Sequence, residues 1–190
     1  MQIYLQIIAG IWIIFMAIIF IPALKNPVPA EHRSSRYIGQ SFVLAIIVVI
    51  LIIILGRFES DPLVLRVIPD SSLAGLAGVA FAIAGLSFST WARFHLGRNW
   101  SSMVMIKVGH QLIRTGPYRI VRNPMYTGIL VAVVGAVIAI GELFAFIALV
   151  IGIASIWFKI KAEEEVLTEK FGEEYLQYKL EVKALIPFIV

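Results

Sequence analysis

The pattern of apolar and polar positions predicts a chain that crosses a lipid bilayer several times. Residues 3–21, 37–55 and 73–94 form three long, almost uninterrupted apolar runs, and Pro22 is expected to close the first of them. A helix of about 20 apolar residues spans the hydrocarbon core of a bilayer. Because a spanning segment in lipid must satisfy its own backbone hydrogen bonds, the β-branched second run is also predicted to be helical.

A further apolar stretch, residues 124–158, is too long for one ordinary span. Gly141-Glu142 interrupts it, which predicts a tight hairpin of two helices over residues 124–140 and 142–158. Beyond the hairpin the chain becomes charged, and apolar side chains share one helical face: Leu167, Phe171, Tyr175, Tyr178 and Val182. We therefore expect an all-α, integral membrane fold of about five transmembrane helices in a single domain, with an amphipathic C-terminal helix along the membrane surface.

Small residues recur at helical spacing in two of the predicted spans. These stripes are Gly75, Gly78, Ala82, Gly85 and Ser89 in one span, and Gly128, Ala132, Gly135 and Ala139 in the other. Small side chains allow two helices to approach closely within a membrane. Both spans are therefore expected to pack against other helices inside the bundle.

Composition and charge support the membrane assignment and orient it. The chain is 60% hydrophobic and only 15% charged, whereas soluble domains are roughly half apolar and a quarter charged. Of the 16 Lys and Arg residues, all but Arg57 and Arg66 fall on one side of the predicted membrane path. The positive-inside rule therefore predicts an external N-terminus, with the C-terminus and the polar loops in the cytoplasm. The same bias explains the net charge of +4 without nucleic acid as a partner.

Common metal and nucleotide sites are not indicated. The chain has no cysteine, and His32, His95 and His110 lack the close helical spacing of a metal-binding pair. No GxGxxG or GxxxxGK[ST] motif is present. Metal binding and a Rossmann or P-loop nucleotide site are therefore not expected.

Two polar segments, residues 97–126 and 159–182, bracket the hairpin and are expected to meet at one membrane face. In the first, Asn123 and Pro124 are typical of a helix start, as N-cap and first helical residue. Two interpretations remain open: a capped helix with ordinary positive-inside residues, or a carboxylate site formed by the helix N-terminus with Arg119 and Arg122.

The second segment carries three consecutive acidic residues, Glu163, Glu164 and Glu165, at the membrane boundary. Lys159 lies four residues before Glu163 and shares its helical face. If this face lines a polar cleft, the carboxylate can meet a ligand ammonium and the lysine a substrate carboxylate. The alternative is a solvated helix start in which these acids pair with Lys159 and Lys161.

At these segments the sequence resembles the isoprenylcysteine carboxyl methyltransferase family and its phospholipid methyltransferase relatives. The motifs are GRNWS at residues 97–101, HQLIRTGPYRIVRNPMYTG at residues 110–128, EExxL at residues 163–167 and FGEEYxxY at residues 171–178. Asn123 replaces the family's usual histidine, and Lys159 stands where an arginine is frequent. The resemblance covers about half of the chain, from residue 97 to the end.

The resemblance implies a membrane enzyme that transfers a methyl group from S-adenosylmethionine to a lipophilic acceptor in the bilayer. The implied cytosol-facing cofactor pocket is lined by His110, Gln111, Leu112, Ile113, Tyr118, Asn123, Pro124, Met125, Tyr126 and Glu163.

The chemistry of methyl transfer suggests roles for three further residues. Arg122 and Lys159 are expected to orient a carboxylate acceptor, and Glu164 to accept the proton if the acceptor is an amine or thiol. The expected activity is carboxyl O-methylation of an isoprenylcysteine-like substrate. Methylation of a phospholipid amine or a thiol, a related nicotinamide-dependent reductase and a non-catalytic membrane protein remain alternatives.

Overall fold

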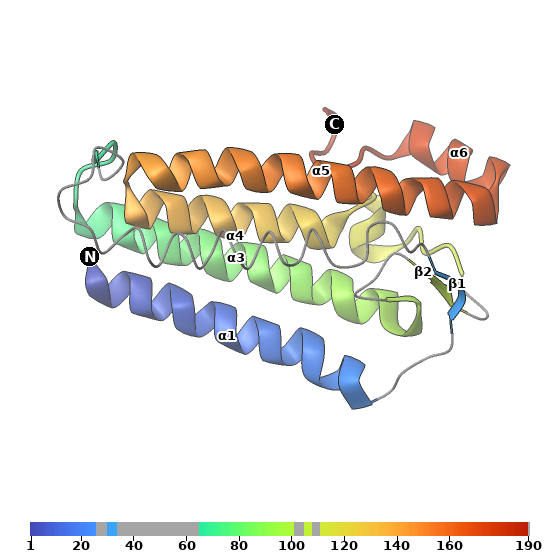
Figure 1. The fold of residues 1–190 in the computed structure, drawn as a ribbon, viewed down its shortest axis with the longest axis horizontal. Helices are drawn as coiled ribbons and strands as arrows, with labels where there is room; N and C mark the ends of the chain where they lie inside the picture. Colours follow the sequence, from blue (N-terminus) through green and yellow to red (C-terminus); the bar gives the residue numbers. More distant parts are fainter. Residues whose placement is uncertain (26–29, 34–64, 101–104, 108–110, 190) are drawn as a thin grey trace.

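A computed structural model describes residues 1–25, 30–33, 65–100, 105–107 and 111–189. Within these ranges the chain forms five α-helices: α1 (Gln2–Lys25), α3 (Ser72–Leu96), α4 (Pro124–Ile140), α5 (Leu143–Phe171) and α6 (Glu173–Glu181). The predicted second span, residues 37–55, lies outside the described residues. In Figure 1, α3, α4 and α5 lie side by side along the long axis of the bundle, and α1 runs along α3.

The described helices have the dimensions and composition of membrane spans, as predicted. Helices α1, α3 and α5 are long and apolar enough to cross a bilayer, whereas α4 is a shorter apolar helix of 17 residues. At a rise of about 1.5 Å per residue, α4 is roughly 26 Å long. That is slightly less than the hydrocarbon thickness of about 30 Å. The helical membrane fold expected from the apolar runs is confirmed.

The two stripes of small residues pack against each other between α3 and α4. A Cβ atom placed on Gly85 would lie 2.4 Å from the carbonyl oxygen of Gly128, and one on Gly78 would lie 2.6 Å from that of Gly135. No real side chain tolerates such distances, so glycine is required for this close approach. The prediction that these spans pack inside the bundle is confirmed, and the two stripes face each other except at Gly75, which lies against Tyr4 of α1.

The hairpin turns where the sequence predicted. Gly141 ends α4 in a left-handed conformation, with φ of 71°, which glycine adopts without a steric penalty. Its carbonyl oxygen accepts hydrogen bonds from the backbone N–H groups of Val67 and Ile68, at 2.7 and 3.0 Å. The turn is thus fixed by the segment that leads into α3, and α4 and α5 return the chain to the same end of the bundle.

Three local features differ from the sequence-based expectations. Helix α1 continues past Pro22 to Lys25, because a proline within a helix removes one hydrogen bond without necessarily ending it. A small antiparallel sheet, β1 (Ala30–Arg33) with β2 (Met105–Lys107), was not predicted. Helix α5 continues to Phe171, and Gly172, with φ of 53°, separates it from α6.

The apolar face predicted to lie on the membrane packs inward in α6. Tyr175 and Tyr178 are each only 2% exposed, whereas Leu176 and Leu180 on the other side of the helix are 41% and 84% exposed. Tyr178 lies against the loop before α4, where its hydroxyl donates a hydrogen bond to the carbonyl oxygen of Tyr118 at 2.5 Å, and the Tyr175 ring packs against Tyr178. The amphipathic pattern correctly identified an apolar face, but protein rather than lipid covers its tyrosines.

Candidate functional site

The structure brings the two polar segments together at the end of the bundle that carries α6. The first segment reaches α4 through a short 3-10 helix (Gly116–Arg119), and the second forms the end of α5 and all of α6. Side chains from α4 and from the residues just before it contact Glu163 and Glu164. The expected meeting of the two polar segments is therefore observed.

Tyr126, Glu163 and Lys159 form the first part of the site, between α4 and α5. The Tyr126 hydroxyl donates a hydrogen bond to Oε1 of Glu163 at 2.6 Å. The Lys159 ammonium lies 5.6 Å from the centroid of the Tyr126 ring, one helical turn before Glu163. All three side chains are partly buried. The arrangement holds one carboxylate in a fixed orientation, with an aromatic face and a cation beside it.

Arg122, Glu164 and Lys179 form a separate charged cluster. Oε1 of Glu164 accepts hydrogen bonds from Nη2 and Nε of Arg122, at 2.8 and 3.1 Å, and Oε2 lies 3.2 Å from Nζ of Lys179. The Arg122 and Glu164 side chains are only 9% and 4% exposed. Because consecutive residues on a helix point about 100° apart, Glu163 contacts α4 while Glu164 turns towards α6. This difference divides the predicted site into two parts.

The C-terminal tail occupies the start of α4. The backbone N–H groups of Arg122 and Asn123 donate to the carbonyl oxygens of Lys183 and Ala184, at 2.8 and 3.0 Å. Nη1 of Arg122 also donates to the carbonyl oxygen of Lys179 at 3.1 Å and to that of Val182. The backbone N–H groups of Arg122 and Asn123, just before α4, are therefore used within the protein.

Asn123 and Pro124 begin α4 as predicted, but their side chains do not act as expected. Asn123 is the N-cap residue and Pro124 the first helical residue, yet the Asn123 side chain makes no capping bond. Its amide Nδ2 instead donates to the Ala184 carbonyl oxygen at 3.3 Å. Pro124 is less than 2% exposed. In this arrangement both residues fix the start of the helix, and their contact with a cofactor stays a prediction.

Tyr118 has the less exposed side chain of the two tyrosines in the predicted pocket. Its hydroxyl donates to the Ala92 carbonyl oxygen at 3.4 Å, and its ring stacks on His95 with the centroids 6.4 Å apart. Burial raises the pKa values of Tyr118 and Tyr178 well above their ordinary value. Both hydroxyls therefore remain protonated hydrogen-bond donors at neutral pH.

The remaining predicted cofactor residues lie in the segment before the 3-10 helix and in the first turn of α4. Gln111 is exposed, and its backbone N–H donates to Oδ1 of Asn99 at 3.2 Å. Leu112 and Ile113 follow it and are partly buried. Met125 packs against the buried cluster that contains Trp100. His110 lies outside the described residues.

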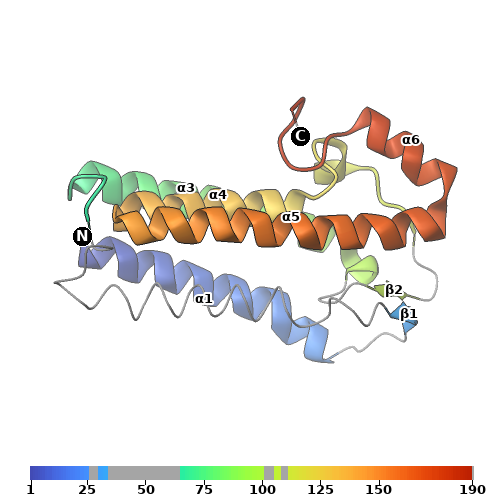
Figure 2. The same cartoon turned by 45° about the horizontal axis from the view of Figure 1, so that its top comes forward.

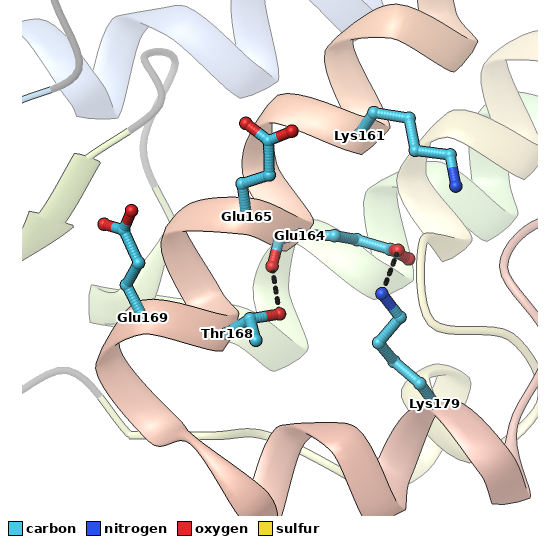
Figure 3. A pocket seen from close by; sticks show the side chains of 6 residues that line it. All are labelled: Lys161, Glu164, Glu165, Thr168, Glu169 and Lys179. Carbon is cyan, nitrogen blue, oxygen red and sulfur yellow. Dashed lines mark hydrogen bonds and ion pairs between the residues drawn. The ribbon is translucent and has the colours of Figure 1, made fainter.

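A hollow of about 440 Å³ separates α5 from α6 (Figure 3). Its walls are formed by Lys161, Glu164, Glu165, Thr168, Glu169 and Lys179. Figure 3 shows the Glu164 carboxylate and the Lys179 ammonium pointing towards each other across it. The hollow therefore adjoins the Arg122 cluster, and Glu163 is not among its lining residues.

Two charged residues near the site were not identified from the sequence. Lys179 forms an ion pair with Glu164. The two residues are 15 positions apart and on different helices, so no helical spacing rule predicts the pair. Arg93 lies in the last turn of α3, with its guanidinium 4.1 Å from the Trp100 ring centroid. Its Nε is buried and has no acceptor among the described residues. The sequence feature that could have identified Arg93 is its position as a lone arginine at the end of an apolar span, just before GRNWS.

Comparisons with known proteins agree with this architecture. The phospholipid methyltransferase family model matches residues 73–174, more than half of the chain. Protein-S-isoprenylcysteine O-methyltransferase from Saccharomyces cerevisiae is 30% identical over 178 residues, covering 90% of this chain and 73% of the relative. Protein-S-isoprenylcysteine O-methyltransferase B from Arabidopsis thaliana is 28% identical over 115 residues, which cover only 58% of its length.

A solved structure has the same fold. It is that of a eukaryotic intramembrane Ras methyltransferase, isoprenylcysteine carboxyl methyltransferase, with a TM-score of 0.65 and 23% identity. The match covers 98% of this chain and 68% of that one. Family match, relatives and fold agree with the motifs around the site, and the chain thus belongs to the family of isoprenylcysteine carboxyl and phospholipid methyltransferases, which are enzymes of the membrane.

Proposed function

We propose that this protein uses S-adenosylmethionine to methylate the carboxylate of an isoprenylcysteine-like acceptor held in the bilayer. The observation that carries the proposal is the Tyr126–Glu163–Lys159 group, in which a carboxylate and a cation lie together at one end of a membrane bundle. Relatives that act on isoprenylcysteine support this choice of acceptor.

The residues around Glu163 fit the amino-acid part of the cofactor. A carboxylate fixed by one hydrogen bond can form a charge-assisted bond to an ammonium group, and such bonds are roughly twice as strong as neutral ones. Tyr126 orients the carboxylate, because its hydroxyl donates to Oε1 of Glu163. The sulfonium of the bound cofactor supplies the activated methyl group. The chain's own contribution is to bind and orient the two reactants.

Lys159 is assigned to the acceptor. A carboxylate acceptor is already ionised near pH 7, so it needs orientation rather than a general base. The bound cofactor would supply its methyl group to an oxygen of this carboxylate, with a methyl ester and S-adenosylhomocysteine as the products. A single flexible ammonium orients the carboxylate without the rigid two-point grip of a guanidinium, which would stabilise the ground state more strongly.

The geometry favours a supporting role for Arg122 and Glu164. The Arg122 guanidinium already binds Glu164 and two tail carbonyl oxygens, and both oxygens of Glu164 face cations. An acceptor carboxylate at Arg122, or an amine or thiol proton at Glu164, would have to displace these partners. We therefore infer that the pair holds the start of α4 in place, and that direct chemistry at either residue is the less favoured alternative.

The membrane sets the paths of the two substrates. The bias of basic residues supports a cytoplasmic location for the α6 end of the bundle, where the water-soluble cofactor would enter. The lipophilic acceptor would reach the same end laterally from the bilayer. Lys159 lies at this boundary, directly after the apolar part of α5.

An acceptor panel tests the proposal. Purified protein in lipid nanodiscs is incubated with methyl-labelled S-adenosylmethionine and N-acetyl-S-farnesylcysteine, its carboxamide analogue, phosphatidylethanolamine or an alkyl thiol. We expect label in the first product only, released as methanol by mild base because it is a methyl ester. Base-stable label on phosphatidylethanolamine would instead support the phospholipid activity named by the family model, and no transfer to any acceptor would contradict the proposal.

A further inference from the structure

The C-terminal tail after α6 exposes an apolar patch that the fold itself does not cover. Ile186, Phe188 and Ile189 are 51%, 95% and 69% exposed, and Leu180 at the end of α6 is 84% exposed. Single exposed apolar residues are common on proteins, but Ile186, Phe188 and Ile189 follow one another closely along the tail, and such a group is typical of an interaction surface. The three tail residues are called the tail patch below.

The tail patch is held in a fixed position. Ala184 and Leu185, which precede it, are 5% and 7% exposed. The carbonyl oxygen of Leu185 accepts a hydrogen bond from Oγ1 of Thr127 at 2.7 Å, in addition to the bonds that the tail makes to Arg122 and Asn123. The tail patch therefore projects from a segment bonded to the first turn of α4.

This position places the tail patch at the edge of the membrane-spanning region. Figures 1 and 2 show the tail running back from α6 along the bundle, away from the end of α5. Its anchor, Thr127, lies in the first turn of the apolar helix α4. On α5 the apolar part ends at Trp157 and the 69% exposed Phe158, and Lys159 and Lys161 follow. Aromatic residues followed by lysines are typical of a membrane–water interface.

We propose that the tail patch inserts into the bilayer at the boundary between headgroups and acyl chains, beside the start of α4. Two features favour lipid as the occupant: the tail is bonded at Leu185 to the first turn of the apolar helix α4, and the exposed Lys183 next to the patch suits anionic headgroups. The proposal rests on the membrane fold alone and does not depend on the identity of the methyl acceptor.

Insertion of the tail patch would connect the bilayer to the candidate site. The carbonyl oxygens of Lys183 and Ala184 lie between the tail patch and the start of α4, where they hold Arg122 and Asn123. Lipid contact at Phe188 thus stabilises the same segment that places Arg122 against Glu164. The bilayer then contributes to the shape of the site as well as supplying the acceptor.

The absence of cysteine in the chain permits a direct test by site-directed spin labelling. Phe188→Cys and Ile189→Cys are labelled with a nitroxide in nanodiscs of phosphatidylcholine and phosphatidylglycerol. Val150→Cys, at a 67% exposed position within α5, is the lipid-facing control, and Glu174→Cys, at an exposed position on α6, is the water-facing control. Size-exclusion chromatography and circular dichroism confirm that each labelled protein is folded.

Relaxation of the nitroxide by two paramagnetic reagents distinguishes lipid, water and protein as surroundings of the label. Oxygen concentrates in lipid and a nickel chelate in water. We expect labels at positions 188 and 189 to be relaxed by oxygen and protected from nickel, as at position 150, whereas position 174 shows the reverse. Nickel accessibility at 188 and 189 equal to that at 174 would overturn the proposal. Protection from both reagents would also overturn it, because protein, such as a second copy of the chain, would then cover the patch.

Discussion

The buried pair of Arg122 and Glu164 gives the sharpest prediction about the architecture of the site. Glu164→Gln removes a charge that is 4% exposed and contacts two cations, and it leaves the Arg122 guanidinium buried without a counter-charge. Breaking one side of a buried ion pair costs on the order of 3–5 kcal/mol. The effect should come mainly from Arg122, because the Lys179 side chain is 33% exposed and exposed pairs contribute less than about 1 kcal/mol.

A double-mutant cycle measures this interaction. The variants are Arg122→Met, Glu164→Leu and the combination of both, with Lys179→Gln as the matched control for the exposed partner. Each single substitution at the pair is expected to lower the unfolding midpoint in detergent by roughly 6–20 °C, at about 2–4 °C per kcal/mol for a chain of this size. The double variant should recover part of the loss, because replacing both charges with apolar groups is often close to neutral.

Two results would contradict this role of the Arg122–Glu164 pair. Losses below about 0.5 kcal/mol in both single variants would show that the pair does not hold the start of α4. Strictly additive losses would show that the two side chains do not interact, whatever their distance. Cofactor affinity measured in the same variants then indicates whether the tail and α4 support the Glu163 region.

Three further predictions concern neighbouring features. Lys159→Gln is expected to lower single-turnover methyl transfer at least about tenfold while S-adenosylhomocysteine affinity stays within about threefold, and normal turnover would remove Lys159 from the acceptor site. Gly85→Ala should destabilise the bundle by about 1–3 kcal/mol, because its Cβ would lie 2.4 Å from a carbonyl oxygen of the facing helix. Gly152→Ala, with no atom within 4 Å, is the matched control and should be nearly neutral in thermal unfolding. Tyr178→Phe should cost about 1 kcal/mol for its lost hydrogen bond. Because burial raises the pKa of Tyr178, the unfolded chain ionises first, so wild-type stability should fall above about pH 10. The fall should be smaller in Tyr178→Phe, and equal alkaline slopes would contradict this assignment.

Features set by local chemistry were predictable from the sequence. Gly141 marked the hairpin turn because glycine tolerates the left-handed conformation that ends α4. The small-residue stripes identified the contact surface of α3 and α4 because their spacing reproduces the helical period. The meeting of the two polar segments followed from the hairpin alone.

Features set by distant contacts were not predictable. Glu163 and Glu164 are adjacent in sequence, yet one contacts α4 and the other α6 and Lys179, which depends on how α6 folds back after Gly172. The tail carbonyl oxygens that bind the start of α4 come from residues about 60 positions away and carry no side-chain signal. Periodicity located the apolar face of α6, but it could not distinguish a lipid from a protein partner for Tyr175.

The most direct test of the account is the effect of Glu163→Gln on cofactor binding. Calorimetric titration of S-adenosylhomocysteine into protein in nanodiscs compares wild type with this variant and with Glu165→Gln, an exposed acidic position two residues away. We predict that Glu163→Gln weakens binding at least about tenfold, which corresponds to about 1.4 kcal/mol, and that Glu165→Gln binds as wild type does. Equal affinity of wild type and a folded Glu163→Gln variant would contradict the central claim that Glu163, oriented by Tyr126, binds the cofactor.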